Sequence, residues 1–308
     1  MAILRFNDIL EPIKPSVITI GMFDGVHIGH QKMIEELKQK AVILGYSSVL
    51  ITFENHPKTI LASKDNKNIE LLQTNEERLK KLSSFNLDYI VTLPFTQKTA
   101  ALSPKSFLDY IAPKLNPQIL LLGYDNRFGN PNNNDFEDII SKGYYKDIKI
   151  LQDKEGFYYK DIEVSSTKIR NAIKEGNILL ANKMLKENYS LIGIVVKGLQ
   201  NGRKLGFPTA NIKIDKNKII PKDGVYATKI FFDSSEYNGI TNIGHNPTFN
   251  AKEKTIETYI FDFSKDIYQR EITVEFIERM RDEMQFADKD CLKQQMLKDT
   301  LYAKKILL

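Results

Sequence analysis

The sequence predicts two domains of different fold class. We expect an α/β amino-terminal domain with a doubly wound parallel sheet, then an all-β small barrel with a terminal helix. The chain has 308 residues, and at roughly 150 residues per domain this length suits two cores. Up to about residue 185, β-rich runs alternate with amphipathic stretches, which is typical of a parallel sheet. Beyond it, strand-like runs follow one another directly. We therefore expect domains at residues 1–185 and 186–308.

The elements of the first domain follow from hydrophobic periodicity. Apolar runs rich in branched residues predict strands at residues 16–21, 47–53, 89–93, 119–122 and 148–151. Amphipathic stretches predict helices at residues 31–44, 76–84, 103–115, 136–141, 167–174 and 178–186. Ser103 at the N-cap and Pro104 at the first helical position mark one helix start. Ligands of such sheets bind beyond the carboxyl ends of the strands, so residues that follow strands are the first candidates for a site.

The second domain contains strand-like runs separated by Gly, Pro, Asn and Asp. These runs lie at residues 191–196, 225–231, 237–243, 255–263 and 271–278. A final helix, residues 289–308, places four apolar side chains on one stripe, which we expect to pack against the barrel. The stripe consists of Leu292, Met296, Leu297 and Leu301.

Composition excludes several classes of protein. A single Cys excludes an internal disulfide framework and any Cys-rich zinc or iron–sulfur site. No run approaches 18 apolar residues, and the start lacks the basic and apolar regions of a signal peptide, so we expect a cytoplasmic protein without a membrane partner. The net charge of +5 is small for so long a chain. It suits nucleotide phosphates better than nucleic acid.

The segment Gly21–His30 (GMFDGVHIGH) lies between the first predicted strand and the first predicted helix, and it holds two of the four His residues. The helix start offers N–H groups and a positive dipole end to an anion. Two imidazoles there can donate hydrogen bonds to phosphate oxygens as charge develops. A zinc site would need further ligands, which the isolated Cys291 and the distant His245 do not supply. We predict catalytic roles for His27 and His30, and nucleotide contacts for Gly21, Phe23, Asp24 and Gly29.

This segment resembles the HxGH signature of the nucleotidyltransferase superfamily, whose domains are Rossmann-like. It is most similar to the adenylyltransferase domain of bacterial FAD synthetases. Three later segments also match: TFENHP at 52–57, GYDNRFG at 123–129 and SSTKIR at 165–170. The resemblance implies flavin contacts for Phe53, His56, Pro57 and Phe128, and nucleotide contacts for Asp125, Ser165, Ser166 and Thr167. It also implies a catalytic role for Arg170, which would stabilise the transition state together with His27 and His30. Taken alone, SSTKIR is equally consistent with a plain helix cap.

The second domain also has a segment rich in candidate ligand-binding residues, residues 198–211 (GLQNGRKLGFPTAN). Glycines flank a basic pair, which suits an anion-binding loop, although such loops are often only hairpin turns. Thr209 and Asn211 lie on one face of an extended segment, where their oxygens could meet Mg²⁺. The stretch resembles the riboflavin kinase family, whose Pro-Thr-Ala-Asn motif supplies Thr and Asn to Mg-ATP. We predict nucleotide contacts for Gly202, Arg203, Gly206 and Pro208.

Glu257 lies on a largely aromatic strand face within residues 255–263 (TIETYIFDF). A carboxylate there suits a general base, and a surface Glu on the barrel exterior is the alternative. The kinase family places its catalytic Glu here, usually in Glu-x-His, whereas this chain has Tyr259 in place of the His. The segment Arg279–Phe286 resembles the family's Arg-x-Glu-x-x-Phe element, which implies flavin contacts for Arg281 and Phe286.

The resemblance spans nearly the whole chain and implies membership of the bifunctional riboflavin kinase and FAD synthetase family. Its substrates would be riboflavin, FMN and ATP, its products FMN and FAD, and its metal Mg²⁺. Two alternatives remain open. Residues 27–30 also match the signature of class I aminoacyl-tRNA synthetases, although the chain lacks a Lys-Met-Ser-Lys-Ser loop. The β domain could also be a non-catalytic flavin-binding module attached to a lone adenylyltransferase.

Overall fold

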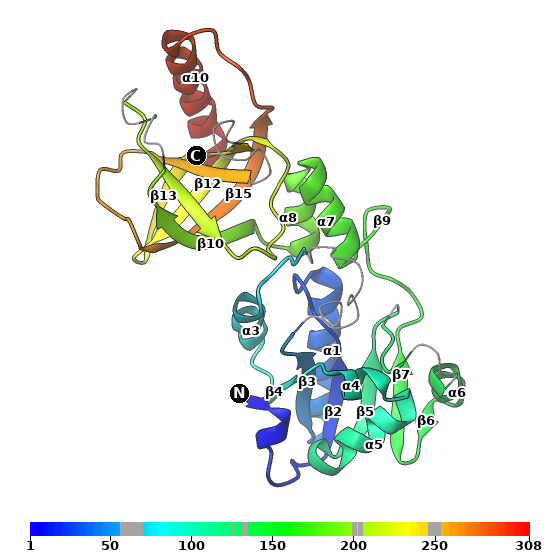
Figure 1. The fold of residues 1–308 in the computed structure, drawn as a ribbon. Helices are drawn as coiled ribbons and strands as arrows, with labels where there is room; N and C mark the ends of the chain where they lie inside the picture. Colours follow the sequence, from blue (N-terminus) through cyan, green and yellow to red (C-terminus); the bar gives the residue numbers. More distant parts are fainter. Residues whose placement is uncertain (56–69, 125, 131–134, 199–201, 203–205, 246–253) are drawn as a thin grey trace. The chain divides into compact units, whose positions relative to one another are not determined.

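The computed structural model describes residues 1–55, 70–124, 126–130, 135–198, 202, 206–245 and 254–308. The chain divides into two compact units, Met1–Ser166 and Thr167–Leu308 (Figure 1). The division falls before the helices α7 (Ser166–Glu175) and α8 (Ile178–Leu185), which cluster almost entirely with the second unit. Four predicted site residues, His56, Pro57, Asp125 and Arg203, lie outside the described residues.

The first unit is built on a seven-stranded sheet with the order β1-β4-β3-β2-β5-β7-β6. Neighbouring strands are parallel except β6 and β7, so the predicted doubly wound parallel sheet is confirmed. The edge strands β1 and β6 and the separate β8–β9 hairpin were not predicted. The strands are β1 (Ala2–Arg5), β2 (Ser16–Ile20), β3 (Ser47–Phe53), β4 (Tyr89–Leu93), β5 (Pro117–Leu122), β6 (Tyr144–Tyr145), β7 (Ile148–Gln152), β8 (Tyr158–Tyr159) and β9 (Ile162–Glu163).

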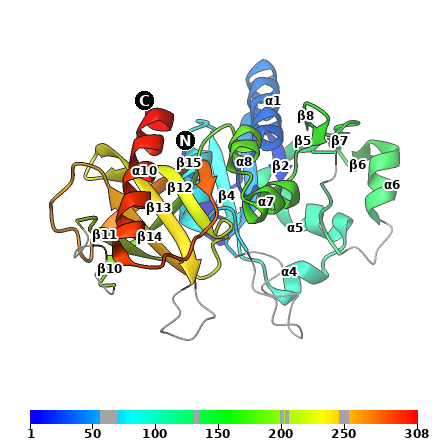
Figure 2. The same ribbon diagram turned by 90° about the horizontal axis from the view of Figure 1, so that it is seen from above.

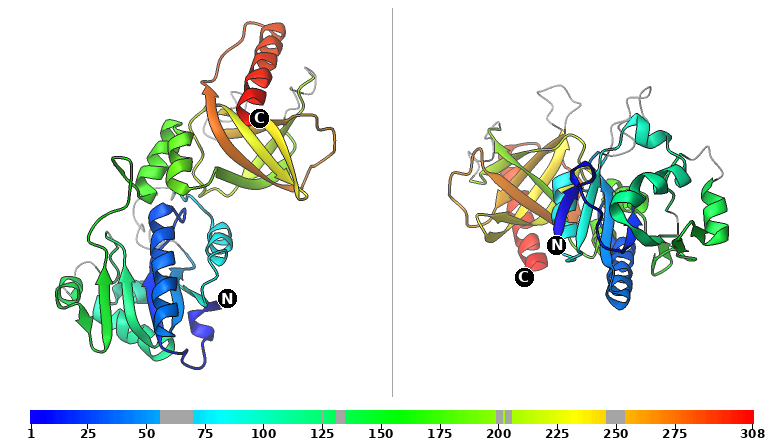
Figure 3. Two further views of the ribbon diagram at one scale, coloured as in Figure 1. Left: turned by 180° about the vertical axis from the view of Figure 1, so that it is seen from behind. Right: turned by 90° about the horizontal axis from the view of Figure 1, so that it is seen from below.

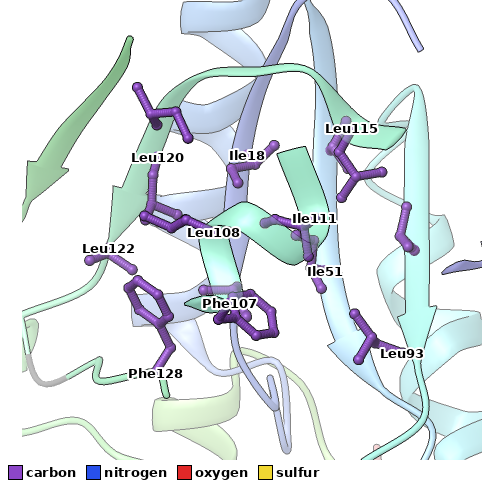
Figure 4. Close-up of a cluster of buried hydrophobic side chains, with 14 of the residues drawn as sticks. Ile18, Ile51, Leu93, Phe107, Leu108, Ile111, Leu115, Leu120, Leu122 and Phe128 are labelled. Carbon is purple, nitrogen blue, oxygen red and sulfur yellow. The ribbon is translucent and has the colours of Figure 1, made fainter. Parts of the chain in front are cut away.

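Helices α1 and α5 cover opposite faces of this sheet (Figure 2). On one face, Ile34 and Leu37 of α1 pack with Val17 and Leu50 of the strands. On the other face, the apolar side of α5 packs over β2, β3, β4 and β5 (Figure 4). The helices of the unit are η1 (Phe6–Asp8), α1 (Ile28–Leu44), α3 (Asn75–Ser83), α4 (Gln97–Ala101), α5 (Pro104–Leu115) and α6 (Asp135–Lys142).

The strand order reverses at β2. Strands β3 and β4 lie on one side of β2, and β5 and β7 lie on the other. Crevices at such a reversal are the usual ligand sites of open α/β sheets. The loop of residues 21–27 follows β2 and the loop that begins at Gly123 follows β5, so two of the predicted motifs meet at this position.

The second unit contains a closed antiparallel barrel with the order β10-β11-β14-β13-β12-β15. Helix α8 packs against β10 and β15, and the carboxyl-terminal end of α10 (Lys289–Leu307) lies on the barrel (Figures 1 and 3). The predicted small barrel with a terminal helix is therefore confirmed. Its strands are β10 (Tyr189–Val196), β11 (Thr209–Ile214), β12 (Gly224–Phe232), β13 (Ser235–His245), β14 (Lys254–Ile260) and β15 (Glu271–Arg281).

Two details of this unit differ from expectation. The barrel closes through β11, the strand that carries Thr209 and Asn211. We had expected this segment to be extended but had not counted it among the strands of the barrel. The predicted stripe of α10 is wrong at Leu297 and Leu301, which are exposed. The buried residues of α10 are instead Asp299 and Ala303, because Asp299 forms an ion pair with Arg281 of β15.

The barrel interior contains a short chain of hydroxyl groups. Thr228 of β12, Thr241 of β13 and Thr258 of β14 are fully buried. Hydrogen bonds of 3.0 and 2.9 Å link their Oγ1 atoms in that order. Each hydroxyl thus finds a partner, which removes most of the cost of burying it.

Among the described residues, no helix has the length and apolar character needed to span a membrane.

Candidate active sites

His27 and His30 meet at the start of α1. Their rings stack with centroids 3.6 Å apart and planes 17° apart. His27 is the N-cap of the helix, and its Nδ1 accepts a hydrogen bond of 3.4 Å from the backbone N–H of His30. Because Nδ1 is an acceptor, the neutral His27 ring carries its proton on Nε2, the nitrogen that remains to donate to a ligand.

His30 lies in an environment that disfavours a positive charge. Burial, and next the neighbouring His27 and Lys81, lower the pKa of His30 well below its usual value of 6.5. Its Nδ1 atom is buried and has no hydrogen bond within the described part of the chain. The ring of Phe23 packs edge-on against His30 with centroids 5.1 Å apart. The pair is therefore held as a stack in which His30 is neutral at pH 7.

The loop that precedes α1 is strained and tightly held. Phe23 and Val26 have φ angles of 52° and 39°, values that are uncommon for residues with side chains. Asp24 is buried, and its two carboxylate oxygens accept hydrogen bonds of 3.1 and 3.0 Å from the backbone N–H groups of Leu72 and Gln73. Phe23 contacts His30, Asp24 fixes the loop, and Lys81 donates a hydrogen bond of 3.2 Å to the carbonyl of Gly25.

The SSTKIR motif begins against this loop. Ser166 Oγ donates a hydrogen bond of 2.9 Å to the backbone carbonyl of Asp24, which joins the first and last motifs of the first unit. Ser165 is half-buried beside it. Thr167 and Arg170 follow on α7 and belong to the second compact unit, where Thr167 is exposed and Arg170 is half-buried.

Some residues of the motifs that follow β3 and β5 are packed in the hydrophobic core. Phe128 is buried, and its ring centroid lies 5.7 Å from those of Phe107 and Phe136. Figure 4 shows the side chains of Phe128 and Phe107 close together. Phe53, at the end of β3, is half-buried and packs edge-on against Phe95. The carboxamide of Asn126 donates to the carbonyl of Ile20, at the end of β2. This bond connects the GYDNRFG loop directly to the strand that leads into the His pair.

The same region contains a buried cation that the sequence motifs did not reveal. Arg78 of α3 is 3% exposed. Its Nη2 donates to the carbonyl of Phe53 at 2.6 Å and to Asn75 Oδ1 at 2.7 Å. Burial lowers the pKa of Arg78, while the nearby charge of Asp24 acts to raise it. Arg78 thus ties the end of β3 to α3. Its only signal in the sequence was a charged position within an amphipathic helix.

The predicted kinase residues gather on the outer face of the barrel. Glu257 of β14 is directly opposite Asn211 of β11, and Tyr259 is directly opposite Thr209. Thr209 Oγ1 donates a hydrogen bond of 3.2 Å to Glu257 Oε2. Neighbouring residues on β14 point into the barrel and are buried, whereas Glu257 and Tyr259 are half-exposed. A hydroxyl, a carboxamide and a carboxylate therefore form one oxygen-rich patch.

The loop between β10 and β11 lies close to this patch. A Cβ atom on Gly198 would overlap the carboxamide of Asn211, so only glycine allows the backbone to approach this closely. The N–H of Phe207 donates to the carbonyl of Gly202 at 2.9 Å. Phe207 in turn packs edge-on against Tyr259, with centroids 5.2 Å apart. Tyr259 thus holds the loop through its ring; Gly206 and Pro208 are exposed beside it.

Arg281 is the last residue of β15, and Phe286 follows the strand by five residues. The Nε and Nη2 atoms of Arg281 bind the carboxylate of Asp299 at 2.6 to 3.1 Å, and Nη1 donates to the carbonyl of Asp282 at 2.9 Å. Phe286 is half-buried. The guanidinium of Arg281 therefore anchors α10 to the barrel.

An oxygen-rich patch with a carboxylate could hold a magnesium ion, which prefers oxygen ligands and carboxylates. Thr209 and Asn211 fit such an ion, because both carry side-chain oxygens on one strand and alternate residues of a strand share a face. No group of three or more His, Cys, Asp or Glu side chains suited to a metal occurs among the described residues. A metal would therefore need oxygens from substrate phosphates as well.

Comparisons with known proteins match the two parts of the chain to two different families. Residues 10–168 match the family model described as FAD synthetase, and residues 185–307 match the one described as Riboflavin kinase. A bifunctional riboflavin kinase/FMN adenylyltransferase from Buchnera aphidicola is 36% identical over 295 residues, covering 94% of this chain and 93% of the relative. A protein of the same name from Bacillus subtilis is 34% identical over 298 residues, covering 94% and 92%.

A solved structure shows the same fold over the full length. It is described as a macrolide-efflux protein from Streptococcus pneumoniae, is 29% identical in sequence, and has a TM-score of 0.87. The match covers 99% of both chains. Two domains of these types therefore occur together in another single chain.

Proposed function

The chain belongs to the family of bifunctional riboflavin kinases and FMN adenylyltransferases, and we propose that it performs its two reactions at two separate sets of residues. It phosphorylates riboflavin to FMN and adenylylates FMN to FAD. We assign residues 1–185 to adenylyl transfer and residues 186–308 to the kinase. The family identity argues against the two alternatives, an aminoacyl-tRNA synthetase and a non-catalytic β module.

The kinase reaction takes place on the outer face of the barrel. Glu257 accepts the proton of the 5′-hydroxyl of riboflavin as the hydroxyl oxygen attacks the γ-phosphorus of ATP. The bond between that phosphorus and the bridging oxygen breaks, and ADP leaves. The hydrogen bond of 3.2 Å from Thr209 holds Glu257 Oε2 in place, and this contact is the observation that carries the assignment. Positioning supplies most of the rate of such transfers.

Thr209 and Asn211 would hold Mg²⁺ at this site, and the ion would neutralise charge on the ATP phosphates. The hydroxyl proton of Thr209 is directed at Glu257, so the lone pairs of Oγ1 face away from it and suit a cation. Gly202, Arg203, Gly206 and Pro208 would contact the nucleotide. Arg281 supports the flavin side through its ion pair with Asp299, and Phe286 would border the isoalloxazine ring.

Adenylyl transfer takes place at the start of α1. A phosphate oxygen of FMN attacks the α-phosphorus of ATP, the bond to the β-phosphate oxygen breaks, and pyrophosphate leaves. The attacking oxygen is already anionic, so no base is needed. His27 and His30 donate to the phosphate oxygens as negative charge moves onto them. Arg170 would stabilise the transition state together with the two His residues. Ser165, Ser166 and Thr167 would bind the triphosphate and Asp125 the nucleotide, while Phe53, His56, Pro57 and Phe128 would shape the flavin side.

Glu257→Gln tests this assignment. We expect kinase turnover to fall by roughly 10²- to 10⁴-fold, the usual contribution of a general base, because Gln keeps the shape but cannot take the proton. Supplied FMN should still be converted to FAD at the unaltered rate. Glu278→Gln on β15 is the matched control, since the Glu278 side chain forms no hydrogen bond or ion pair with any residue that the structure describes. Loss of both activities in a folded Glu257 variant would contradict separate sites.

A further inference from the structure

We propose that Asn242 binds the ribityl chain of riboflavin beside Glu257, and that Glu283 holds Asn242 in place and disfavours the product FMN. This inference rests on the proposed role of Glu257 as the base. It adds to the kinase site two residues to which the sequence motifs assigned no role, and it assigns them to the acceptor substrate rather than to ATP.

The first argument is the register of the barrel. Glu257 is directly opposite Asn211 on one side and directly opposite Asn242 of β13 on the other. Side chains at directly opposite positions have Cβ atoms about 4.5–5.5 Å apart. The three side chains therefore form one row on the outer face. The β11 end of the row carries the residues assigned to Mg-ATP, so a hydroxyl that reaches Glu257 from the opposite side lies against Asn242.

The second argument is chemical. A carboxamide both donates and accepts hydrogen bonds, which matches the hydroxyl groups of a polyol. Asn242 Nδ2 donates to Glu283 Oε1 at 3.3 Å. In the described part of the chain its Oδ1 has no hydrogen bond, so the carbonyl remains an acceptor for an alcohol.

The third argument is that the Glu283 carboxylate occupies a space left by a glycine. Gly244 lies two residues after Asn242 on the same strand, and a Cβ atom there would overlap the carboxylate of Glu283. Glycine thus leaves the space that the carboxylate occupies. Glu283 follows β15 by two residues, so this contact docks the segment that leads to Phe286 onto β13. The pair thus joins β13 to the segment that follows β15, a strand that is not adjacent to β13 in the barrel.

The fourth argument is charge. Glu257 and Glu283 place two carboxylates on the β13 side of the row. Riboflavin is uncharged along its ribityl chain, so it meets no electrostatic penalty there. FMN carries a phosphate dianion, which Glu283 repels. Glu283 thereby favours binding of the substrate over retention of the product.

Steady-state kinetics of the full chain test the role of Asn242. Asn242→Ala should raise the KM for riboflavin about tenfold, the effect of losing roughly 1.4 kcal/mol of hydrogen bonding. The KM for ATP and the rate of FAD formation from supplied FMN should not change. Asn238→Ala, on the same strand and face, is the matched control. An equal rise in the KM values for riboflavin and ATP, or no rise in either, would overturn the proposal.

Product inhibition tests the role of Glu283. The assay uses a His30→Ala background, so that FMN is not consumed, and counts the label passed from γ-labelled ATP to flavin. Glu283→Gln retains an acceptor for Asn242 but removes the charge, so FMN should inhibit at least about threefold more strongly while the KM for riboflavin stays within about twofold. Glu278→Gln should leave both constants unchanged. Unchanged FMN inhibition in Glu283→Gln would refute the electrostatic role.

The two levels of the proposal fail differently. If Glu257→Gln keeps its kinase turnover, the assignment of the base is wrong. If Glu257→Gln is inactive but Asn242→Ala binds riboflavin normally, the base assignment stands and the ribityl contact is wrong.

Discussion

The ion pair between Arg281 and Asp299 allows a quantitative prediction. The Asp299 carboxylate is 8% exposed and the Arg281 side chain 20% exposed, and the two are joined by bonds of 2.6 to 3.1 Å. Gln295 adds a hydrogen bond of 2.8 Å to Asp299 Oδ1. Removing one partner of a fully buried pair costs about 3–5 kcal/mol, because the other charge is left without compensation.

Asp299→Ala should destabilise the barrel unit by about 2–3 kcal/mol, somewhat below the fully buried range, because water can reach Arg281 in the variant. For a unit of this size each kcal/mol lowers the Tm by roughly 4 °C, so we expect a shift of about 10 °C. Differential scanning calorimetry of the full chain measures it. The first unit's transition should stay in place, and the KM for riboflavin should rise because α10 no longer supports the end of β15.

Two further variants make this test discriminating. Asp290→Ala removes an exposed carboxylate of the same helix and should shift the Tm by less than about 2 °C, as surface charges contribute little. Replacing both partners, Arg281→Met with Asp299→Leu, should recover most of the lost stability, because no unpaired charge remains. A Tm of Asp299→Ala equal to that of the Asp290 control, or a double variant as unstable as the single one, would refute the reasoning.

Three further predictions concern buried polar groups. In the folded protein the pKa of His30 lies below the usual 6.5, so as the pH falls the unfolded chain binds a proton at His30 before the folded chain does. The first unit should therefore lose stability as the pH falls below 6.5. His30→Gln should reduce this loss, as measured by urea unfolding midpoints between pH 7 and pH 5. Asp24→Asn should cost about 1.5–3 kcal/mol by weakening its charge-assisted bonds, and should slow FAD formation but not FMN formation. Thr241→Val, at the centre of the hydroxyl chain, should cost about twice the roughly 1 kcal/mol of Thr258→Val at its end, as measured by chemical unfolding.

Each of these has an outcome that would contradict it. Wild-type acid sensitivity in His30→Gln would mean that another group titrates in this range. Equal slowing of both reactions by Asp24→Asn would mean that the loop affects the whole chain. Equal costs at Thr241 and Thr258 would mean that the hydroxyls do not form a chain in solution.

The order of strands and helices in the first unit could be predicted because hydrophobic periodicity is a local property. The helix α5 shows this well: Ser103 caps it, with its Oγ accepting from Ser106 N–H at 3.2 Å, and Pro104 is its first residue, as expected. The edge strand β1 could not be predicted. It has only four residues, which alternate between half-buried and exposed, and its pairing with β4 defines it as a strand.

The barrel was predicted with one strand too few, because β11, like β1, is defined by its pairing with other strands. Strand β11 contains Asn211 and Lys213, and only one of its six residues is buried, so it lacks an apolar pattern. Its identity as a strand depends on pairing with β10 and β14. The face of α10 was misread because Asp299 looks like a solvent-facing residue until its partner Arg281, 18 positions away, is known.

The sequence by itself determined the family, the two fold classes and the motifs, because these depend on residue types and spacings along the chain. Only the tertiary structure decided which of the motif residues are buried and which lie side by side on the surface. Asp24 and Phe128 belong to the motifs yet are buried, whereas Asn242, which had no assigned role, lies directly opposite Glu257. The physical reason is that strand register and burial are set by contacts between residues far apart in the chain, which local pattern does not record.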